Sequence, residues 1–197
     1  MYYLTVGTRE IREDLFREIA DSKLNGSIKP SGGLWLTRYD IKYPFYNEWV
    51  DYILSHPNIL FYKNRGDSPF CQPCAVVDVD DDAKIYSLMS KGDYDDLVRC
   101  YGDVHGRFSF EELSKEWDGI YININSLMDS LDGRTVNLFS SFGVNSLILF
   151  RMEAILEYYS GNVMIDPIDY EDYLNFCFSS YHIIVDQKQK FLVRKKD

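Results

Sequence analysis

The sequence predicts one mixed α+β domain that spans residues 1–197. Its 197 residues are the usual length of a single domain and suffice to bury a core without disulfides or metal. Hydrophobic residues make up 46% of the chain and aromatic residues 16%, which is typical of an ordered globular protein. Short β-prone runs alternate with helical periodicities, and no repeat or linker interrupts them, so a single mixed domain is the simplest interpretation.

Aromatic and β-branched runs predict the strands. The first run covers residues 2–6 and ends at Gly7-Thr8, and a second covers residues 34–37 after a turn at residues 31–33. Further strands are predicted at residues 60–63, 75–79, 84–88, 119–124, 136–138 and 145–150. The alternation over residues 182–193 predicts a terminal hairpin that turns at residues 186–188.

Apolar residues at helical spacing predict the helices. A first helix is expected over residues 10–23, and Asn47 is expected to cap a second helix that carries Trp49 and Ile53. Residues 93–101 and 110–117 predict two more, the latter with Ser109 as its cap. Residues 153–159 are expected to continue as a helix or turn.

The charge of the chain restricts its partners. A net charge of −10 argues against a broad phosphate-tracking surface for nucleic acid and against docking on an anionic membrane. No apolar run reaches transmembrane length, and the start of the chain does not resemble a signal peptide because Arg9 and Glu10 follow a short apolar run. Two of the four cysteines are close together and two are scattered, which is not the dense pattern of a secreted disulfide-rich domain, so the chain is expected to be cytoplasmic with reduced thiols.

Cys71 and Cys74 have the spacing of half a zinc site. A closed site needs two more ligands at a comparable spacing. The remaining cysteines and the later histidines follow no such pattern: Cys100, His105, Cys177 and His182. We therefore predict that Cys71 and Cys74 lie in a loop and that the protein binds no metal there.

The most informative stretch is residues 29–37, Lys-Pro-Ser-Gly-Gly-Leu-Trp-Leu-Thr. Proline and paired glycines end the preceding segment, and a glycine lets other groups approach the backbone closely. One interpretation is a tight turn that enters a buried strand. The other is a turn that lets a ligand approach, and it requires further motifs.

Three later segments supply such motifs: residues 82–86 (DAKIY), 117–121 (WDGIY) and 142–150 (FGVNSLILF). With residues 29–37 they resemble, in order, the KPxGGLW(T/S), AKIY, (Y/W)DGI and WDxESxLWF segments of small bacterial and phage proteins that look like the ADP-ribosyltransferase superfamily. The resemblance covers roughly residues 1–155. It implies two small antiparallel sheets around an NAD-type cleft with flanking helices, NAD as substrate and a macromolecular acceptor.

The resemblance also implies a set of cofactor-binding residues. In the superfamily a His or Arg ends the first strand and holds the adenosine ribose, but Val6 stands there, with Thr5 or Arg9 as replacements. Thr37 matches the hydroxyl that supports the pocket at the second strand. The remaining candidates are the turn residues Gly7, Thr8 and Gly33, and Tyr46, an aromatic residue for stacking on the nicotinamide.

Asn145 occupies the position of the superfamily's catalytic Glu, in Gly-Val-Asn-Ser where the pattern has Asp-x-Glu-Ser. An amide hydrogen-bonds a ribose but carries no charge to stabilise an oxocarbenium-like centre. Asp118, Glu153 and Glu157 are expected to be solvated or capping carboxylates rather than replacements. Three functions stay open: an NAD-dependent ADP-ribosyltransferase-like protein with weak or lost activity, a non-catalytic nucleotide- or protein-binding module, and an acidic interaction protein that uses the fold as a scaffold.

Overall fold

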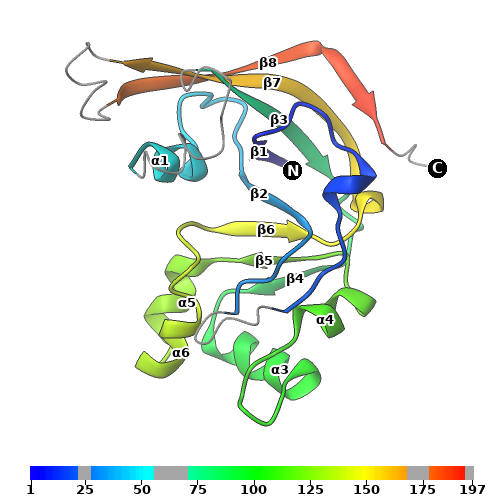
Figure 1. Cartoon of the computed structure of the whole chain (residues 1–197), viewed down its shortest axis with the longest axis vertical. Coiled ribbons are helices and arrows are strands. Elements are labelled where there is room, and N and C mark those ends of the chain that lie inside the picture. The colour runs from blue at the N-terminus through cyan, green and yellow to red at the C-terminus, as the bar shows by residue number, and fades with distance from the viewer. Residues whose placement is uncertain (22–27, 56–70, 168–177, 194–197) are drawn as a thin grey trace. The chain divides into compact units, whose positions relative to one another are not determined.

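The computed structural model describes residues 1–21, 28–55, 71–167 and 178–193. The chain divides into two compact units of mixed α and β structure, with mostly antiparallel strands (Figure 1). Unit 1 consists of Met1–Ile11, Thr37–Asp80 and Ile155–Asp197, and unit 2 of Arg12–Leu36 and Asp81–Ala154. The mixed α/β class expected from the sequence is therefore confirmed, whereas the single-domain organisation stays a prediction.

Unit 1 is built on an antiparallel sheet of long strands. β1 (Tyr2–Val6) pairs with β3 (Cys71–Val79), β3 with β7 (Ile155–Pro167), and β7 with β8 (Phe178–Leu192). The last two residues of β2 (Leu34–Arg38) pair with the other edge of β1, where Thr37 lies opposite Leu4. Helix α1 (Glu48–Ser55) belongs to the same unit.

The core of unit 1 lies on one face of this sheet. Side chains of direct cross-strand partners point to the same face of a sheet. Leu4 lies opposite Val76, and Val76 lies opposite Tyr159, so these three residues mark the core face. α1 buries Val50 and Ile53 in this core. The other buried members are Tyr39, Cys74, Val163, Ile165, Tyr181 and Ile183.

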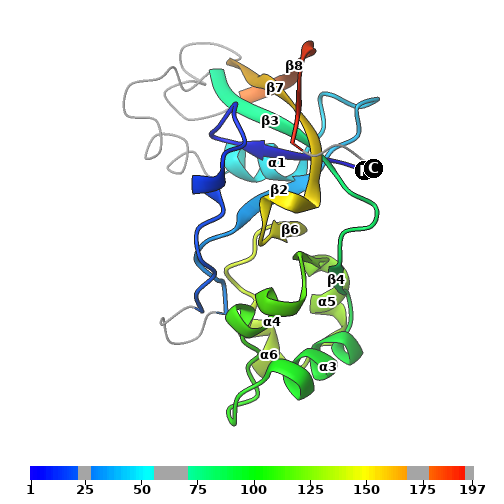
Figure 2. The same ribbon diagram turned by 90° about the vertical axis from the view of Figure 1, so that its right-hand side faces the viewer.

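Unit 2 combines a four-stranded arrangement with short helices. β4 (Ile85–Leu88) runs parallel to β5 (Gly119–Ile122), which pairs antiparallel with β6 (Ser146–Leu149). β6 in turn pairs antiparallel with the first three residues of β2. Both views show the helices gathered on one side of these strands (Figures 1 and 2): α3 (Lys91–Tyr101), α4 (Phe110–Glu116), α5 (Ile124–Ser130) and α6 (Gly133–Leu138). The core between them is rich in leucine, isoleucine and phenylalanine, including Leu88, Leu97, Phe110, Ile120 and Phe139.

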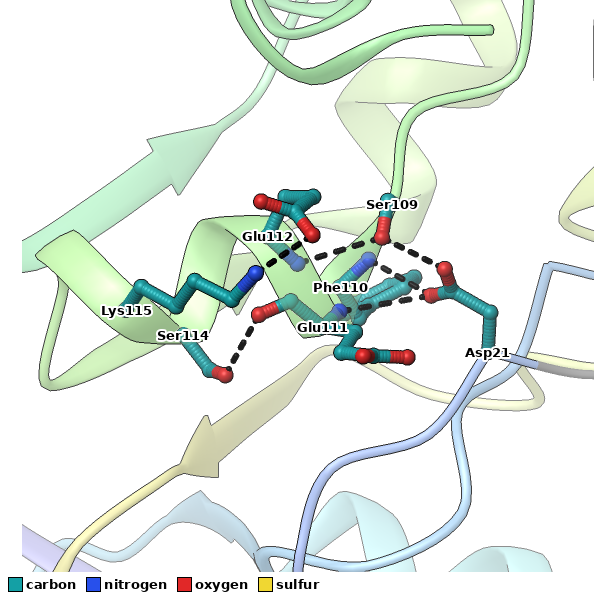
Figure 3. Close-up of polar contacts among 7 residues, drawn as sticks. All are labelled: Asp21, Ser109, Phe110, Glu111, Glu112, Ser114 and Lys115. Carbon is teal, nitrogen blue, oxygen red and sulfur yellow. Dashed lines mark hydrogen bonds and ion pairs between the residues drawn. The ribbon is translucent and has the colours of Figure 1, made fainter.

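A carboxylate from a distant segment holds the start of α4 (Figure 3). The Ser109 side chain accepts a hydrogen bond from the Glu112 amide, which confirms the predicted cap. Asp21 accepts hydrogen bonds from the amides of Phe110, at 2.7 Å, and Glu111, and from the Ser109 hydroxyl. The first amides of a helix have no partner within it, so Asp21 satisfies two of them and ties residue 21 to α4.

The prediction of a helix over residues 10–23 is wrong for residues 10–21, the part of this segment that the structure describes. Only Glu13–Leu15 forms a helical turn, of the 3-10 type, and Ala20 pairs with Ser31 as an isolated β-bridge. The Gly33 amide also donates to the Arg17 carbonyl. Non-local pairing with the turn at residues 31–33 therefore replaces the local helical bonds that the apolar spacing favoured.

Four other expectations are wrong. Residues 71–74 begin β3 rather than forming a loop, and residues 136–138 belong to helix α6 rather than a strand. Residues 155–159 start the long β7, after a 3-10 turn at Met152–Ala154. The tail forms no hairpin of its own because β8 pairs with β7 on both sides of residues 186–189.

Several local predictions are confirmed. The strand at residues 2–6 matches β1, and those at residues 34–37, 75–79, 84–88, 119–124 and 145–150 match β2 to β6 within a few residues at their ends. Asn47 caps α1, because its side-chain oxygen accepts from the amides of Trp49 and Val50. The strand expected at residues 60–63 lies outside the described residues.

We expect Gly33→Ala to destabilise the protein. Gly33 has a φ of 66°, and an added Cβ would lie 2.9 Å from both the Ile148 Cγ2 and the Leu149 oxygen. Left-handed backbone costs an L-residue about 1–2 kcal/mol and overpacking about 1–3 kcal/mol, so the free energy of unfolding should fall by about 2–4 kcal/mol. Denaturant titration measures this change.

The matched control is Gly133→Ala at the start of α6, where an added Cβ meets no atom within 4 Å. Alanine is the better helix former, so this variant should be neutral or more stable by less than about 1 kcal/mol. Equal effects of the two substitutions would contradict the packing role of Gly33.

Candidate functional site

The four segments that carry the resemblance become the four strands of unit 2. β2 comes from the first, β4 and β5 from the second and third, and β6 from the fourth. One row across the strands contains a residue of each segment: Trp35, Ile148, Ile120 and Tyr86. Segments spread over more than half of the chain are thus hydrogen-bonded neighbours.

Residues 29–37 are held together by contacts among their own side chains and with the fourth segment. The Lys29 ammonium lies 4.6 Å from the ring centre of Trp35 and 5.9 Å from that of Phe142. The Trp35 indole donates to the Gly32 carbonyl at 3.2 Å. The backbone of Gly33 approaches β6 too closely for a side chain. These contacts match the interpretation of the segment as a tight turn entering a buried strand.

Asn145 lies immediately before β6 and is half-buried. Its side-chain oxygen accepts a hydrogen bond, at 3.5 Å, from the amide of Asn125 in the first turn of α5. The following residue, Ser146, donates its hydroxyl to the Val144 carbonyl and steadies the entry into the strand. The amide of Asn145 is therefore oriented by unit 2 itself and satisfies a donor that α5 leaves unpaired.

Gly33 and Asn145 lie at opposite ends of the ladder between β2 and β6. Leu34, which follows Gly33, pairs with Leu149, whereas Asn145 precedes the other end of β6. Within unit 2 the structure therefore does not bring these two candidates together.

The other candidates belong to unit 1. Gly7 follows β1 with a φ of 106° and donates its amide to the Pro73 carbonyl at 2.7 Å. The Thr8 hydroxyl donates to the Glu10 carbonyl at 2.7 Å and so closes a local turn. Tyr46 is 62% exposed, in the segment that leads to α1. Exposure leaves this ring accessible to a ligand.

Thr37 is 4% exposed, and its hydroxyl is committed to a structural network. It donates to the side-chain oxygen of Asn47 at 3.0 Å, the same oxygen that caps α1. The Asn47 side-chain nitrogen donates to the Arg38 carbonyl, and its backbone amide donates to the Tyr181 hydroxyl. Thr37 therefore positions the start of α1 from the neighbouring strand.

Cys71 and Cys74 stand three residues apart in a strand, so their side chains point to opposite faces of the sheet. Cys71 donates to the Asn162 side-chain oxygen at 3.7 Å. Burial raises the pKa of the Cys74 thiol to about 12, with Arg9 acting in the opposite direction. Among the described residues no group of three or more His, Cys, Asp or Glu side chains is placed to hold a metal ion.

The carboxylates expected to be solvated or capping differ from one another. Glu153 is exposed, and Asp118 pairs with Arg151 at 3.3 Å and accepts from the Lys84 amide. The expectation is wrong for Glu157, whose side chain is only 13% exposed. Glu157 forms an ion pair with Lys190 and accepts a hydrogen bond from the Tyr159 hydroxyl at 2.7 Å. Recognising residues 155–159 as a strand would have placed Glu157 and Tyr159 on one face.

Comparisons with models of protein families, with curated proteins and with solved structures give no match. In the parts of the chain that the structure describes, no helix is both long and apolar enough to span a membrane. Function is therefore inferred from the residues of this chain and their arrangement.

We expect Thr37→Val to lower the free energy of unfolding by about 1–2 kcal/mol, because it removes a buried hydrogen bond to the cap of α1. Thr37→Ser retains the hydroxyl, so its free energy of unfolding should fall by less. Chemical denaturation of both variants measures the difference. A valine variant as stable as the natural chain would show that the hydroxyl does not support α1.

The ionisation of Glu157 is expected to make the stability of the protein depend on pH. Burial disfavours its charge, but the hydrogen bonds from Lys190 and Tyr159 outweigh burial and hold the pKa of Glu157 below its ordinary value of 4.5. A lowered pKa in the folded state stabilises the fold above pH 4.5, and this contribution is lost as the pH falls through the folded-state pKa.

Glu157→Gln removes that titration. Melting temperatures between pH 7 and pH 3 should therefore fall more steeply for the natural chain than for Glu157→Gln. Exposed Glu153→Gln serves as the matched control and should follow the natural chain. Parallel curves for the natural chain and Glu157→Gln would contradict the assignment.

Proposed function

We propose that this chain is an NAD-dependent ADP-ribosyltransferase-like protein whose transferase activity is weak or lost. The observation that carries the proposal is the assembly of all four resembling segments as neighbouring strands, with one residue of each in a single row. The proposal includes the fold that the resemblance implies, with two small antiparallel sheets around an NAD-type cleft. It also includes a macromolecular acceptor and a cytoplasmic location.

The proposed roles follow the resemblance residue by residue. Asn145 takes the position of the catalytic Glu. The proposed cofactor-binding residues are Gly7, Thr8, Gly33, Thr37 and Tyr46. The exposed ring of Tyr46 supports a stacking role on the nicotinamide, whereas the buried hydroxyl of Thr37 acts through Asn47.

Weak activity follows from electrostatics. Positive charge develops at the anomeric carbon as nicotinamide leaves, and a fixed carboxylate stabilises that charge mainly in the transition state. Asn145 offers only an amide dipole, and its oxygen already accepts from the Asn125 amide. Loss of one preorganised stabilising group typically costs about 3–4 kcal/mol, or roughly 100- to 1000-fold in rate.

Asn145→Glu should therefore raise NAD cleavage above the slow or absent turnover of the natural chain. Glutamate is one methylene longer, so we expect partial recovery within that roughly 100- to 1000-fold range. Nicotinamide release at equal protein concentration measures the rate.

The matched control is Asn137→Glu, the same change at an exposed position of α6, which should leave turnover unaltered. Robust turnover by the natural chain that persists in Asn145→Ala would show that the catalytic position is assigned to the wrong residue.

A non-catalytic nucleotide- or protein-binding module is the second candidate, and the neutral, hydrogen-bonded side chain of Asn145 favours it. Calorimetric titration with NAD separates the two. Saturable heat without nicotinamide release in either the natural chain or Asn145→Glu would support a binding module. Absence of NAD binding would reject the NAD-dependent transferase and a module that binds NAD, and would leave a protein-binding or scaffold role.

A further inference from the structure

Unit 1 contains a pocket of about 220 Å³ that none of the proposed NAD-binding residues lines. Tyr2, Tyr39 and Tyr159 form its aromatic walls, and Val76 and Val185 complete its apolar lining. Ile41, which is 45% exposed, also lines it. Among the described residues that line it, Lys190 is the one that carries a charge.

The strand register explains why the pocket forms at this place. Val76, Tyr159 and Lys190 are consecutive cross-strand partners and share the core face of the sheet. On β7, one residue separates Tyr159 from Gly161. On β8, residues 186–189 separate their partners, Lys190 and Val185. This register shift separates the two lining residues of β8, Val185 and Lys190, along the strand.

Specific contacts hold two of the tyrosine walls. The rings of Tyr2 and Tyr159 meet edge to face with their centres 6.3 Å apart, and Tyr159 is fixed through its hydroxyl by Glu157. Tyr39 is 4% exposed, and burial raises its pKa to about 12, so its hydroxyl stays protonated at neutral pH. Rings held in this way offer faces and edges to a flat aromatic guest.

Lys190 supplies the polar end of the pocket. Its ammonium pairs with Glu157, and the side chain remains 46% exposed. An ammonium has three donors, so pairing with one carboxylate leaves capacity for a second acceptor. Glu157 does not itself line the pocket and already accepts from Tyr159 and Lys190. The Lys190 ammonium therefore gives the pocket a hydrogen-bond donor for an anionic group.

We propose that this pocket binds a small planar aromatic carboxylate, with the ring between the tyrosine side chains and the carboxylate on Lys190. The volume suits a ring of this kind because a cavity of roughly 150 Å³ already holds benzene. The acidic net charge of the protein opposes such a ligand weakly, since charges beyond a Debye length of about 8 Å are screened at physiological ionic strength.

Benzoate titrated into the full chain, followed by calorimetry and ligand-observed NMR, tests the proposal. Benzoate should bind saturably. Cyclohexanecarboxylate keeps the charge without the aromatic ring, and benzylammonium keeps the ring with the opposite charge. Cyclohexanecarboxylate, which lacks the aromatic contacts, should bind about two- to tenfold more weakly than benzoate. Benzylammonium, which lacks the ionic hydrogen bond, should bind more weakly than benzoate by about tenfold or more.

Two variants locate the binding. Ile41→Trp replaces a lining side chain by a larger one, so it should fill part of the pocket and abolish benzoate binding. Ile184→Trp makes the same change at an exposed residue next to Val185 but on the opposite face of β8, and should bind as the natural chain does. Lys190→Gln should weaken benzoate about tenfold or more with little effect on phenol. Circular dichroism verifies the fold of each variant.

The proposal is overturned if benzoate shows no saturable binding, or if Ile41→Trp, when folded, binds it unchanged. It is equally overturned if cyclohexanecarboxylate or benzylammonium binds as tightly as benzoate. If Ile41→Trp does not fold, Lys190→Gln alone tests the proposal. Unchanged affinity of Lys190→Gln for benzoate would then reject the site.

Discussion

Unit 2 depends on the close approach of two neighbouring strands to β6, which only glycine permits. On one side a Cβ at Gly33 would lie 2.9 Å from the Leu149 oxygen. On the other side a Cβ at Gly119 would lie 2.7 Å from the Ile148 oxygen. The two glycines therefore flank the same end of the central strand, and side chains there would force β2 and β5 away from it. The row from Trp35 to Tyr86, whose central members Ile148 and Ile120 are buried, requires this spacing.

The same constraint accounts for part of the sequence resemblance. Glycines of the first and third resembling segments pack against the strand formed by the fourth. Lys29, Trp35 and Phe142 join the first and fourth segments through cation–π contacts. Packing therefore accounts for these glycine and aromatic positions without a ligand, and the proposed function rests on the assembly of the four segments and on the position of Asn145.

In unit 1, polar side chains that suggest a ligand site are used to hold the fold. Thr37 and Asn47 form one buried network that starts α1. Glu157 links β7 to β8 through Lys190 and accepts a hydrogen bond from Tyr159 in its own strand. A buried polar group without a partner is costly, so such side chains are placed where another strand or helix satisfies them. The register shift in β8 then leaves the tyrosine-lined pocket at the end of this core.

Features that depend on neighbouring residues along the chain could be predicted from the amino-acid order. Alternation and caps correctly predicted β1, β2, the start of α1 at Asn47 and the start of α4 at Ser109, because each arises from local backbone geometry and short-range hydrogen bonds.

Features that depend on distant partners could not be predicted in this way and are seen in the fold. Residues 10–23 have helical spacing, yet Ala20 pairs with Ser31, and β7 and β8 extend through segments whose patterns suggested a helix and a hairpin. The candidate site divides in the same way. Gly33 and Asn145 were identified from sequence, but the packing that requires Gly33 and the partner of Asn145 in α5 come from other elements. Non-local hydrogen bonds and packing override weak local preferences because they satisfy buried backbone groups and remove more apolar surface from water.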